Sequence, residues 1–308
     1  MNNFLNISDH SSNELKAIID EAKERKLKRR GLNKSAPDED KPFVGKSMAM
    51  IFEKPSTRTR MSFDIAAKQL GGSSIILNPD GIHYGKGDES LKDTAKVLTE
   101  YVDIVMLRTS SHKNLEEFGK YLDIPIINGL SDISHPCQIM SDILTYEESN
   151  GLITNKTVSW LGDGNNNMSN SLIEAAGKFN FKLKIGCPKK YAPSKKVLSW
   201  AKKNKVKLIV TTKPDEAVKN SDCIMTDKWI SMNDKVNKKQ KKKILKPYQV
   251  NKRLMCKAKP DAIFMHCLPV GRGEEVTDEI IDGKQSVVWR QALNRVHTQK
   301  SIIKWCLD

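Results

Sequence analysis

The sequence has no long apolar run, and this absence excludes one class of protein. Within 308 residues of 38% apolar content, no segment approaches the roughly 18 to 20 apolar residues that a membrane-spanning helix needs. The opening residues, MNNFLNISDH, also lack the charged-then-apolar pattern of a secretion signal. We therefore expect a soluble, cytoplasmic protein that makes no membrane contacts.

Paired cysteines and metal-ligand motifs are also missing. The six cysteines include no C-x-x-C pair, and a chain of this length does not need disulfides to stabilise it. The six histidines include no H-E-x-x-H motif and no cluster at metal-ligand spacing. We expect reduced thiols and chemistry without a metal.

Nucleotide-binding signatures are absent or weak. The P-loop pattern G-x-x-x-x-G-K-[ST] does not occur, which argues against nucleoside triphosphates. The segment GDGNNN at 162–167 lacks the third glycine of a dinucleotide loop, and the next predicted strand is followed by lysines instead of an acidic residue that could bind ribose. We expect no cofactor.

Positive charge is abundant. The net charge is +15, and KVNKKQKKKILK at 235–246 concentrates part of it. This charge would suit a nucleic acid, but the run has no aromatic residues between its lysines for base stacking. A solvated basic loop or helix face fits the run better, and small anionic substrates fit the overall charge equally well.

Short apolar runs alternate with helical patterns along the whole chain. We predict strands at 47–52, 74–77, 102–107, 125–127, 157–161, 182–186, 207–211, 222–225, 262–265 and 286–288. We predict helices at 11–29, 57–70, 91–101, 137–148, 169–179, 194–203 and 291–305. The alternation indicates an α/β fold of two parallel-sheet domains joined by helices, the second Rossmann-like.

The domain boundary is expected near EESNGLITNK at 147–156, where a helix ends in Asn-Gly and a new strand begins. This gives a first domain at 1–150, which includes the linking helix 137–148, and a second at 151–290. The last helix, in 291–308, has no strand after it. We expect it to pack back on the first domain.

The segment FEKPSTRTRMSF at 52–63 predicts an anion-binding site. A buried strand precedes it, a helical pattern follows, and Ser56 stands where the helix N-cap should be. The free N–H groups of a first helical turn attract anions, and Ser56, Thr57, Arg58 and Thr59 add donors. Arg60 points to a different side and could hold the loop. An ordinary capped helix is the alternative, but helix dipoles disfavour cations there unless an anion is bound.

Other polar residues fall at strand ends, where parallel α/β sheets bind ligands. In the first half, Arg108 ends a strand, while His135 and Gln138 lie one turn apart at the start of the linking helix. In the second half, polar side chains occur in three loops, at 163–167, at 227–232 and at 266–268. The first half thus offers cations, and the second offers a carboxylate, amides and a thiol.

These motifs together resemble those of the carbamoyltransferases. The resemblance covers nearly the whole chain, through F-x-K-x-S-T-R-T-R, H-P-C-Q, G-D-x-N-N, D-x-W-x-S-M, H-C-L-P and the closing NRVHT. S-T-R-T-R with H-P-x-Q is typical of carbamoyl-phosphate users, whereas D-x-W-x-S-M and H-C-L-P narrow the match to the members that use ornithine. The resemblance implies transfer of a carbamoyl group to the δ-amine of L-ornithine, giving L-citrulline and phosphate in arginine metabolism, with biosynthesis as the expected direction.

The resemblance also implies the roles of individual residues. Carbamoyl phosphate would be bound by Ser56, Thr57, Arg58, Thr59, His83, Arg108, His135, Gln138, Cys267, Leu268 and Arg295. L-Ornithine would be bound by Asn167, Asp227, Ser231 and Met232, and the catalytic residues would be Arg58, His135 and Cys267. His83 would reach the site of a neighbouring subunit, which implies a homotrimer.

The sequence departs from the family pattern at a few positions. Asn233 follows S-M where glycine is usual, Gly271 stands where histidine is common, and Leu293 replaces an acidic residue. The loop that contains His83 is one residue longer than is typical. These departures concern loop closure and the subunit contact more than the chemistry. Two alternatives stay open: a nucleic-acid-binding protein, and carbamoyl transfer to putrescine instead of ornithine.

Overall fold

Parallel sheets form the centre of each half of the chain. The computed structural model describes residues 2–78, 89–230 and 237–308. It divides into unit 1, which comprises Met1–Leu144 and Leu293–Asp308, and unit 2, which comprises Thr145–Ala292. Among the described residues, no helix has the combination of length and apolar character that a membrane crossing requires.

The sheet of unit 1 has four parallel strands in the order β2-β1-β3-β4. Its strands are β1 (Ser47–Phe52), β2 (Ser73–Leu77), β3 (Ile104–Arg108) and β4 (Ile126–Leu130). Both faces of β1 and β3 are buried, as near-continuous apolar strands of parallel sheets require. The edge strand β2 is more exposed.

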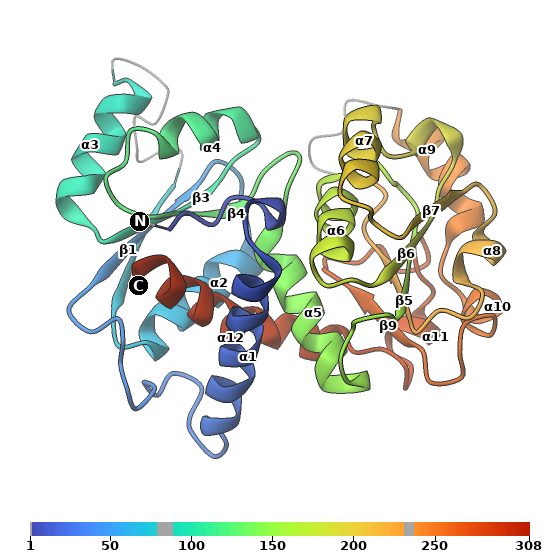
Figure 1. Ribbon diagram of the computed structural model, residues 1–308, viewed down its shortest axis with the longest axis horizontal. Helices are drawn as coiled ribbons and strands as arrows, with labels where there is room; N and C mark the ends of the chain where they lie inside the picture. Colours follow the sequence, from blue (N-terminus) through green and yellow to red (C-terminus); the bar gives the residue numbers. More distant parts are fainter. Residues whose placement is uncertain (1, 79–88, 231–236) are drawn as a thin grey trace. The chain divides into compact units, whose positions relative to one another are not determined.

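Helices cover both faces of this sheet (Figure 1). The helices of unit 1 are α1 (Ser12–Lys28), α2 (Thr57–Gln69), α3 (Leu91–Tyr101) and α4 (His112–Gly119), with parts of α5 (Pro136–Asn150) and α12 (Val288–Leu307). Apolar residues of α3 and α4 pack on one face against Ala49, Ile51 and Val105. α2 ends as expected before Gly71, whose φ of +90° is a left-handed conformation that glycine adopts readily.

The sheet of unit 2 has five parallel strands in the order β7-β6-β5-β8-β9. Its strands are β5 (Thr157–Leu161), β6 (Lys182–Gly186), β7 (Leu208–Thr211), β8 (Cys223–Thr226) and β9 (Ile263–His266). Leu161, Ile224 and Phe264 lie on one face and pack against the helices that follow β7 and β8.

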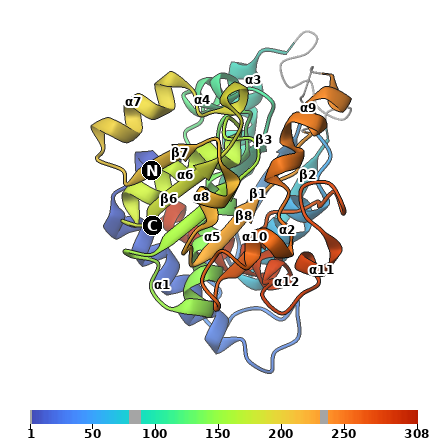
Figure 2. The same cartoon turned by 90° about the vertical axis from the view of Figure 1, so that its right-hand side faces the viewer.

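The helices of unit 2 also lie on both faces of its sheet (Figure 1 and Figure 2). They are α6 (Asn167–Lys178), α7 (Lys195–Lys203), α8 (Pro214–Val218), α9 (Lys238–Leu245), α10 (Lys252–Met255) and α11 (Asp278–Ile281). Single 3-10 turns occur at Ile7–Asp9, Lys189–Tyr191 and Lys246–Tyr248. The two parallel-sheet units confirm the predicted fold class.

One predicted strand is wrong. Residues 286–288 were expected to pair in the sheet, but Ser286 makes only an isolated bridge to Phe264, and α12 already begins at Val288. The side chain of Gln291 accepts a hydrogen bond from the backbone N–H of His266 at the end of β9 (2.9 Å), so a helical residue contacts this strand end. The sequence of so short a run does not show whether it forms a strand of the sheet or a single bridge before a helix.

Each sheet has a topological switch point, a place where the connections leave two neighbouring strands toward different sides of the sheet. In unit 1 this place lies between β1 and β3, and in unit 2 it lies between β5 and β8. Loops at the carboxyl ends of such strand pairs leave a crevice that ligands use. The predicted site residues follow these strands.

Candidate active site

The N-terminus of α2 lies directly after β1, at the switch point of unit 1. Ser56 is the N-cap, as predicted, and its side chain accepts a hydrogen bond from the N–H of Thr59 (3.3 Å). Thr57 and Arg58 occupy the first turn, which contains no acidic residue. The remaining N–H groups of this turn and the helix dipole therefore favour an anion.

Two arginines from distant parts of the sequence meet at Thr59. The Thr59 hydroxyl accepts hydrogen bonds from Arg108 Nη1 (3.3 Å) and from Arg295 Nη2 (2.9 Å). Arg295 Nη1 also donates to Gln138 Oε1 (2.6 Å), and Gln138 Nε2 donates to Asp142 Oδ1 (2.8 Å). Strand β3, helix α5 and helix α12 thus each contribute a polar side chain at the start of α2.

His135 belongs to the same group of side chains. It is almost fully buried, and this burial lowers its pKa well below the usual range. The charges of Arg295, Arg108 and Arg58 lower the pKa further, so these guanidinium groups lie near the ring. His135 is therefore neutral at physiological pH and can donate or accept a hydrogen bond without adding charge.

The neighbouring residues Arg60 and Cys137 have structural contacts instead. Arg60 donates a hydrogen bond to Asn78, and its guanidinium lies 5.7 Å from the ring centre of Phe52. These contacts fit the prediction that Arg60 holds the loop. Cys137 is buried and donates to the carbonyl of Asn128 (3.4 Å), and burial raises the pKa of its thiol to about 12. Cys137 therefore cannot act as a thiolate.

The loop after β5 forms one side of the switch point of unit 2. Asp163 accepts a hydrogen bond from the N–H of Asn165 (2.9 Å), and its carbonyl accepts one from the indole of Trp160 (2.9 Å). Asn166 caps α6, of which Asn167 is the first residue. Gly162 has a φ of +119°, and an added Cβ would lie 3.3 Å from the indole nitrogen of Trp229. The loop thus needs glycine at that position.

The loops after β8 and β9 bring a carboxylate and a thiol together. Cys267 Sγ donates to Asp227 Oδ1 (3.1 Å), and the same oxygen accepts from the N–H of Lys228 (2.7 Å). Leu268 follows in a left-handed conformation, with a φ of +59°. Of the predicted ornithine-binding residues, Asp227 follows β8 and Asn167 begins the helix after β5, so both lie at the same edge of the sheet.

His266 supports this arrangement from within the sheet. Its Nδ1 accepts from the N–H of Leu268 (2.8 Å), and its Nε2 faces Glu275 Oε1 (3.3 Å). The possible ligand atoms of Asp227, His266 and Cys267 lie within 4.8 Å of one another, a spacing that a metal ion could use. A metal would have to displace one of the two hydrogen bonds of His266.

Several predicted positions lie outside the described residues. His83, Ser231, Met232 and Asn233 are among them. Of the other two departures from the family pattern, Leu293 is exposed. Gly271 adjoins a buried carboxylate, and an added Cβ would lie 2.7 Å from Glu275 Oε2. This contact is a local reason for glycine at position 271.

The sequence prediction missed Lys241. We expected the lysine-rich run to be a solvated loop or helix face, but Lys241 is only 4% exposed and its Nζ lies 2.7 Å from Asp163 Oδ2. Its ammonium group also lies 5.2 Å from the ring centre of Tyr191. The spacing of Lys241, Ile244, Leu245 and Tyr248 is helical, and this periodicity could have identified the buried position.

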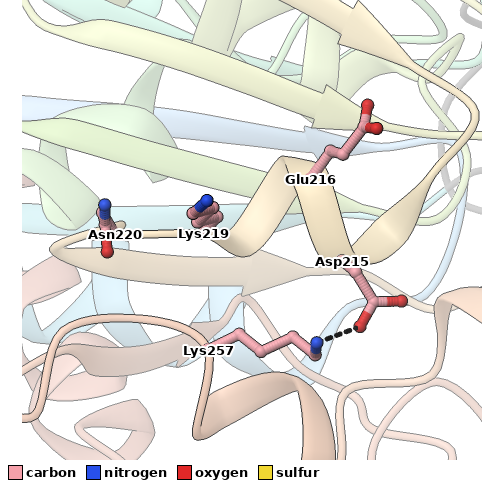
Figure 3. Close-up of a pocket in the computed structure, with 5 residues that line it drawn as sticks. All are labelled: Asp215, Glu216, Lys219, Asn220 and Lys257. Carbon is pink, nitrogen blue, oxygen red and sulfur yellow. Dashed lines mark ion pairs between the residues drawn. The ribbon is translucent and has the colours of Figure 1, made fainter.

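A separate opening of about 380 Å³ lies on unit 2 (Figure 3). It is lined by Asp215, Glu216, Lys219, Asn220 and Lys257. Asp215 Oδ1 lies 3.1 Å from Lys257 Nζ, and Arg253 donates to the same carboxylate (2.5 Å). Of the predicted site residues that the structure describes, none lines this opening.

Comparisons with known proteins identify family domains in both halves of the chain. Residues 2–148 match the model for the carbamoyl-P binding domain of aspartate/ornithine carbamoyltransferase. Residues 154–306 match the model for the Asp/Orn binding domain of aspartate/ornithine carbamoyltransferase.

Individual relatives agree with these domain matches. The chain is 48% identical over 305 residues to an ornithine carbamoyltransferase of Brucella suis, covering 99% of this chain and 95% of the relative. The solved ornithine carbamoyltransferase of Pyrococcus furiosus is 42% identical, with a TM-score of 0.91 and coverage of 98% and 95%. The anabolic ornithine carbamoyltransferase of Campylobacter jejuni is 35% identical, with a TM-score of 0.89 and coverage of 99% of each chain.

Proposed function

The chain belongs to the aspartate/ornithine carbamoyltransferase family, and we propose that it carbamoylates L-ornithine with carbamoyl phosphate. In this proposal, residues 1–150 bind carbamoyl phosphate and residues 151–290 bind ornithine, with the C-terminal segment 291–308 contributing to the first site. The products are L-citrulline and phosphate. The reaction needs no metal or cofactor, because the substrate already carries an activated carbonyl.

One observation carries the proposal: Arg108 and Arg295 converge on Thr59 at the N-terminus of α2. Carbamoyl phosphate is a dianion, and a helix N-terminus with nearby guanidinium groups is suited to its phosphate. We assign Ser56, Thr57, Arg58, Thr59, Arg108 and Arg295 to this phosphate.

The carbonyl of carbamoyl phosphate requires different groups. Charge builds on its oxygen as the amine attacks, and donors already in place stabilise that charge. His135 and Gln138 are buried, and neither introduces a net charge at this point. We propose that His135, Gln138 and Arg58 polarise the carbonyl. The family resemblance adds Cys267 and Leu268 as contacts of the carbamoyl group.

Ornithine is assigned to the loops of unit 2. Asp227 is a carboxylate suited to the α-ammonium group of an amino acid, and Asn167, Ser231 and Met232 complete the proposed contacts. Putrescine has no amino-acid head group, so Asp227 favours ornithine over that alternative substrate.

The transfer step balances with these groups alone. The δ-amine reacts in its neutral form: its nitrogen forms a bond to the carbamoyl carbon, the bond from that carbon to the phosphate oxygen breaks, and the nitrogen then loses one proton. The Cys267 thiol donates to Asp227, so it can accept a proton only after passing its own to that carboxylate. The departing phosphate can take the proton in the end. We keep Cys267 among the catalytic residues on this basis.

The proposal is tested by an assay of the purified protein with carbamoyl phosphate and one of three acceptors: ornithine, putrescine or aspartate. We expect citrulline from ornithine and little product from the other two. Preferential carbamoylation of putrescine would overturn the substrate assignment. Absence of product with all three acceptors, from a folded protein, would overturn the activity.

We also propose a homotrimer. Ile75 is 49% exposed and Ile76 36% exposed on the edge strand β2, and Met61 on the adjacent helix α2 is 54% exposed. Exposed apolar side chains on a sheet edge favour coverage by another chain. In the trimer His83 would reach the site of a neighbouring subunit. Light scattering behind a sizing column measures the mass, and a monomer at micromolar concentration would contradict this assignment.

A biosynthetic role in the cytoplasm completes the proposal. The similar Campylobacter jejuni enzyme is an anabolic ornithine carbamoyltransferase, and all six cysteines of this chain are free thiols, as is usual in a reducing compartment. Expression in an ornithine-fed, citrulline-requiring strain tests the direction. Growth without citrulline is the expected result, and failure to grow despite activity in the extract would contradict a biosynthetic role.

A further inference from the structure

Two loops of unit 1 are joined by three hydrogen bonds. One loop follows β3 and starts at Arg108; the other follows β4 and leads to His135. The N–H of Thr109 donates to the carbonyl of Leu130 (3.0 Å), and the N–H of His112 donates to Asp132 Oδ1 (2.7 Å). The His112 side chain makes the third bond, from Nδ1 to Ser131 Oγ (2.8 Å). We call these three bonds the loop clasp.

The strands themselves prepare this contact. The register between β3 and β4 shifts after Leu107, so that Arg108 lies opposite Leu130. Gly129 is the extra residue of β4 at this irregularity, and an added Cβ there would lie 2.3 Å from Met106 Sδ. Bulges of this kind redirect a strand end near a binding site.

Ser131 transmits the clasp to the turn before His135. Its N–H donates to the carbonyl of Ser134 (2.9 Å), and its Oγ accepts from the N–H of Ser134 (3.2 Å). Ser131 is fully buried, and His112 and Ser134 are nearly so. Ser131 Oγ also forms a hydrogen bond with His112 Nδ1, so the position of the turn depends on His112.

The imidazole can keep this bond in either protonation state. When Nδ1 is unprotonated, the Ser131 hydroxyl donates a hydrogen bond to it. When Nδ1 is protonated, it donates to Ser131 Oγ, and the Ser131 hydroxyl can then donate to the carbonyl of Ser134 (3.3 Å). The other ring nitrogen faces Glu116 at 3.6 Å, on the exposed side of α4. These contacts indicate that His112 supports the turn in either protonation state.

We propose that His112 is a positioning residue, which acts through Ser131 to hold His135 and Gln138 at a fixed separation from Arg108. This inference rests on the proposed function, in which Arg108 binds the phosphate of carbamoyl phosphate and the other two bind its carbonyl. A rigid separation matters because this substrate is small. If the residues that bind its phosphate shift relative to those that bind its carbonyl, contacts to the transition state weaken although no contact residue is removed.

The clasp makes a prediction about ligand preference. Inorganic phosphate needs only the phosphate half of the site, whereas carbamoyl phosphate needs both halves at the correct separation. Loosening the clasp should therefore weaken binding of carbamoyl phosphate and leave that of phosphate nearly unchanged. A residue that only stabilised the fold would lower the unfolding midpoint without changing this preference.

The experiment compares four forms of the full chain: wild type, His112→Ala, His112→Asn and Glu116→Gln. Asparagine places a polar atom near the position of Nδ1 and can still bond Ser131, so His112→Asn is the rescue variant. Glu116→Gln is the control, because the Glu116 side chain is 54% exposed. Titration calorimetry with fresh carbamoyl phosphate and with inorganic phosphate gives the two affinities, and thermal unfolding gives stability.

We expect His112→Ala to reduce the preference for carbamoyl phosphate over phosphate by about tenfold, as loss of one buried hydrogen bond implies. His112→Asn should recover most of this loss, and Glu116→Gln should match wild type. The proposal is overturned if His112→Ala weakens both ligands equally, or if it changes only the unfolding midpoint. It is also overturned if wild type shows no preference for carbamoyl phosphate.

Activity separates this inference from the proposed function. If wild type binds carbamoyl phosphate tightly but yields no citrulline, the proposed function is wrong. The role of His112 is still tested in that case, because the affinities for carbamoyl phosphate and inorganic phosphate do not depend on turnover. Where citrulline is formed, we expect His112→Ala to lower kcat and raise KM for carbamoyl phosphate, with KM for ornithine changed by less than about twofold. A rise confined to the ornithine KM would contradict the clasp.

Discussion

Charged side chains near the two switch points have opposite signs, and in both units some of them bond neutral groups. In unit 1, Arg108 and Arg295 donate to the neutral oxygens of Thr59 and Gln138. In unit 2, Asp227 accepts hydrogen bonds from a thiol and a backbone N–H. Neutral partners orient a charge without cancelling it, so a ligand of opposite sign still gains from meeting it.

Ion pairs within each unit support the fold instead, and one of them involves the switch-point loop after β5. In unit 2, Lys241 pairs with Asp163. In unit 1, Arg25 and Lys300 both pair with Asp38, at 3.1 and 2.9 Å, and join α1 and α12 to the segment before β1. In these examples the ion pairs link elements of the fold, whereas the bonds to Thr59, Gln138 and Cys267 connect the proposed site residues to one another.

Breaking a structural ion pair should have the largest effect, and it should act on stability. Lys241→Met leaves Asp163 buried without its cation, and we expect the free energy of unfolding to fall by about 3 to 5 kcal/mol. Lys242→Met is the matched control: Lys242 is on the same helix, its side chain is 42% exposed, and it pairs with Glu274. Exposed pairs contribute about 1 kcal/mol or less. Urea unfolding measures the loss of stability in both variants. Equal losses would contradict the distinction between buried and exposed ion pairs.

Removing an arginine of the anion site should act on turnover instead. We expect Arg58→Gln to lower kcat by about a hundredfold or more, because a donor aimed at the developing charge is lost. Arg60→Gln is the control from the same helical turn, since Arg60 bonds Asn78 and stacks on Phe52. Steady-state kinetics measures kcat for both variants, after their folding has been verified. Similar reductions in kcat would contradict the separate roles of Arg58 and Arg60.

Neutralising the carboxylate of unit 2 should affect only one substrate. We expect Asp227→Asn to raise KM for ornithine by about ten- to a hundredfold, the range for hydrogen bonds to charged groups. Asp215→Asn is the control, because Asp215 lines the opening of Figure 3 and pairs with lysine and arginine. An equal rise in KM for carbamoyl phosphate would show that Asp227 does not select the amine.

The smallest predicted effect concerns pH. Burial, together with the charges of Lys300, Lys26 and Arg29, lowers the pKa of His297 from 6.5 to about 3. As the pH falls below 6.5, the unfolded chain binds a proton that the folded chain excludes, so the stability due to neutral His297 is present above this pH and is lost toward pH 3.

We therefore expect wild type to lose more stability than His297→Gln on acidification. Between about pH 7.5 and about pH 5.5 the difference should be about 1 kcal/mol in the free energy of unfolding. Denaturant titration at the two pH values measures it. Identical losses in the two proteins would mean that burial and the nearby cations do not keep this histidine neutral.

The strands and the anion loop were predictable because their signals are local. β1, β5 and β6 begin and end at the predicted residues, and Ser56 is the predicted N-cap. Apolar runs bounded by turn residues, and a hydroxyl before a helical pattern, depend on neighbours only. The strand predicted at 286–288 was wrong because that prediction also used neighbouring residues only, and these do not indicate that α12 begins at Val288.

Local patterns did not predict which side chains contact one another in the candidate site, because these contacts join residues far apart in the sequence. Arg295 lies 236 residues from Thr59, and Lys241 makes an ion pair with Asp163 from a run that looked solvated. His112 gave no signal, since its motif is an ordinary helix start and its partner lies beyond the next strand.

The sequence alone determined the fold class, the loop that binds an anion and, through its motifs, the family, because each follows from short patterns of residue type. Only the tertiary structure decided which charged side chains meet a charged partner, as Lys241 meets Asp163, and which meet the neutral oxygens of Thr59 and Gln138. That distinction depends on where the strand ends of a parallel sheet bring distant side chains together, and burial then makes each such pairing strong enough to matter.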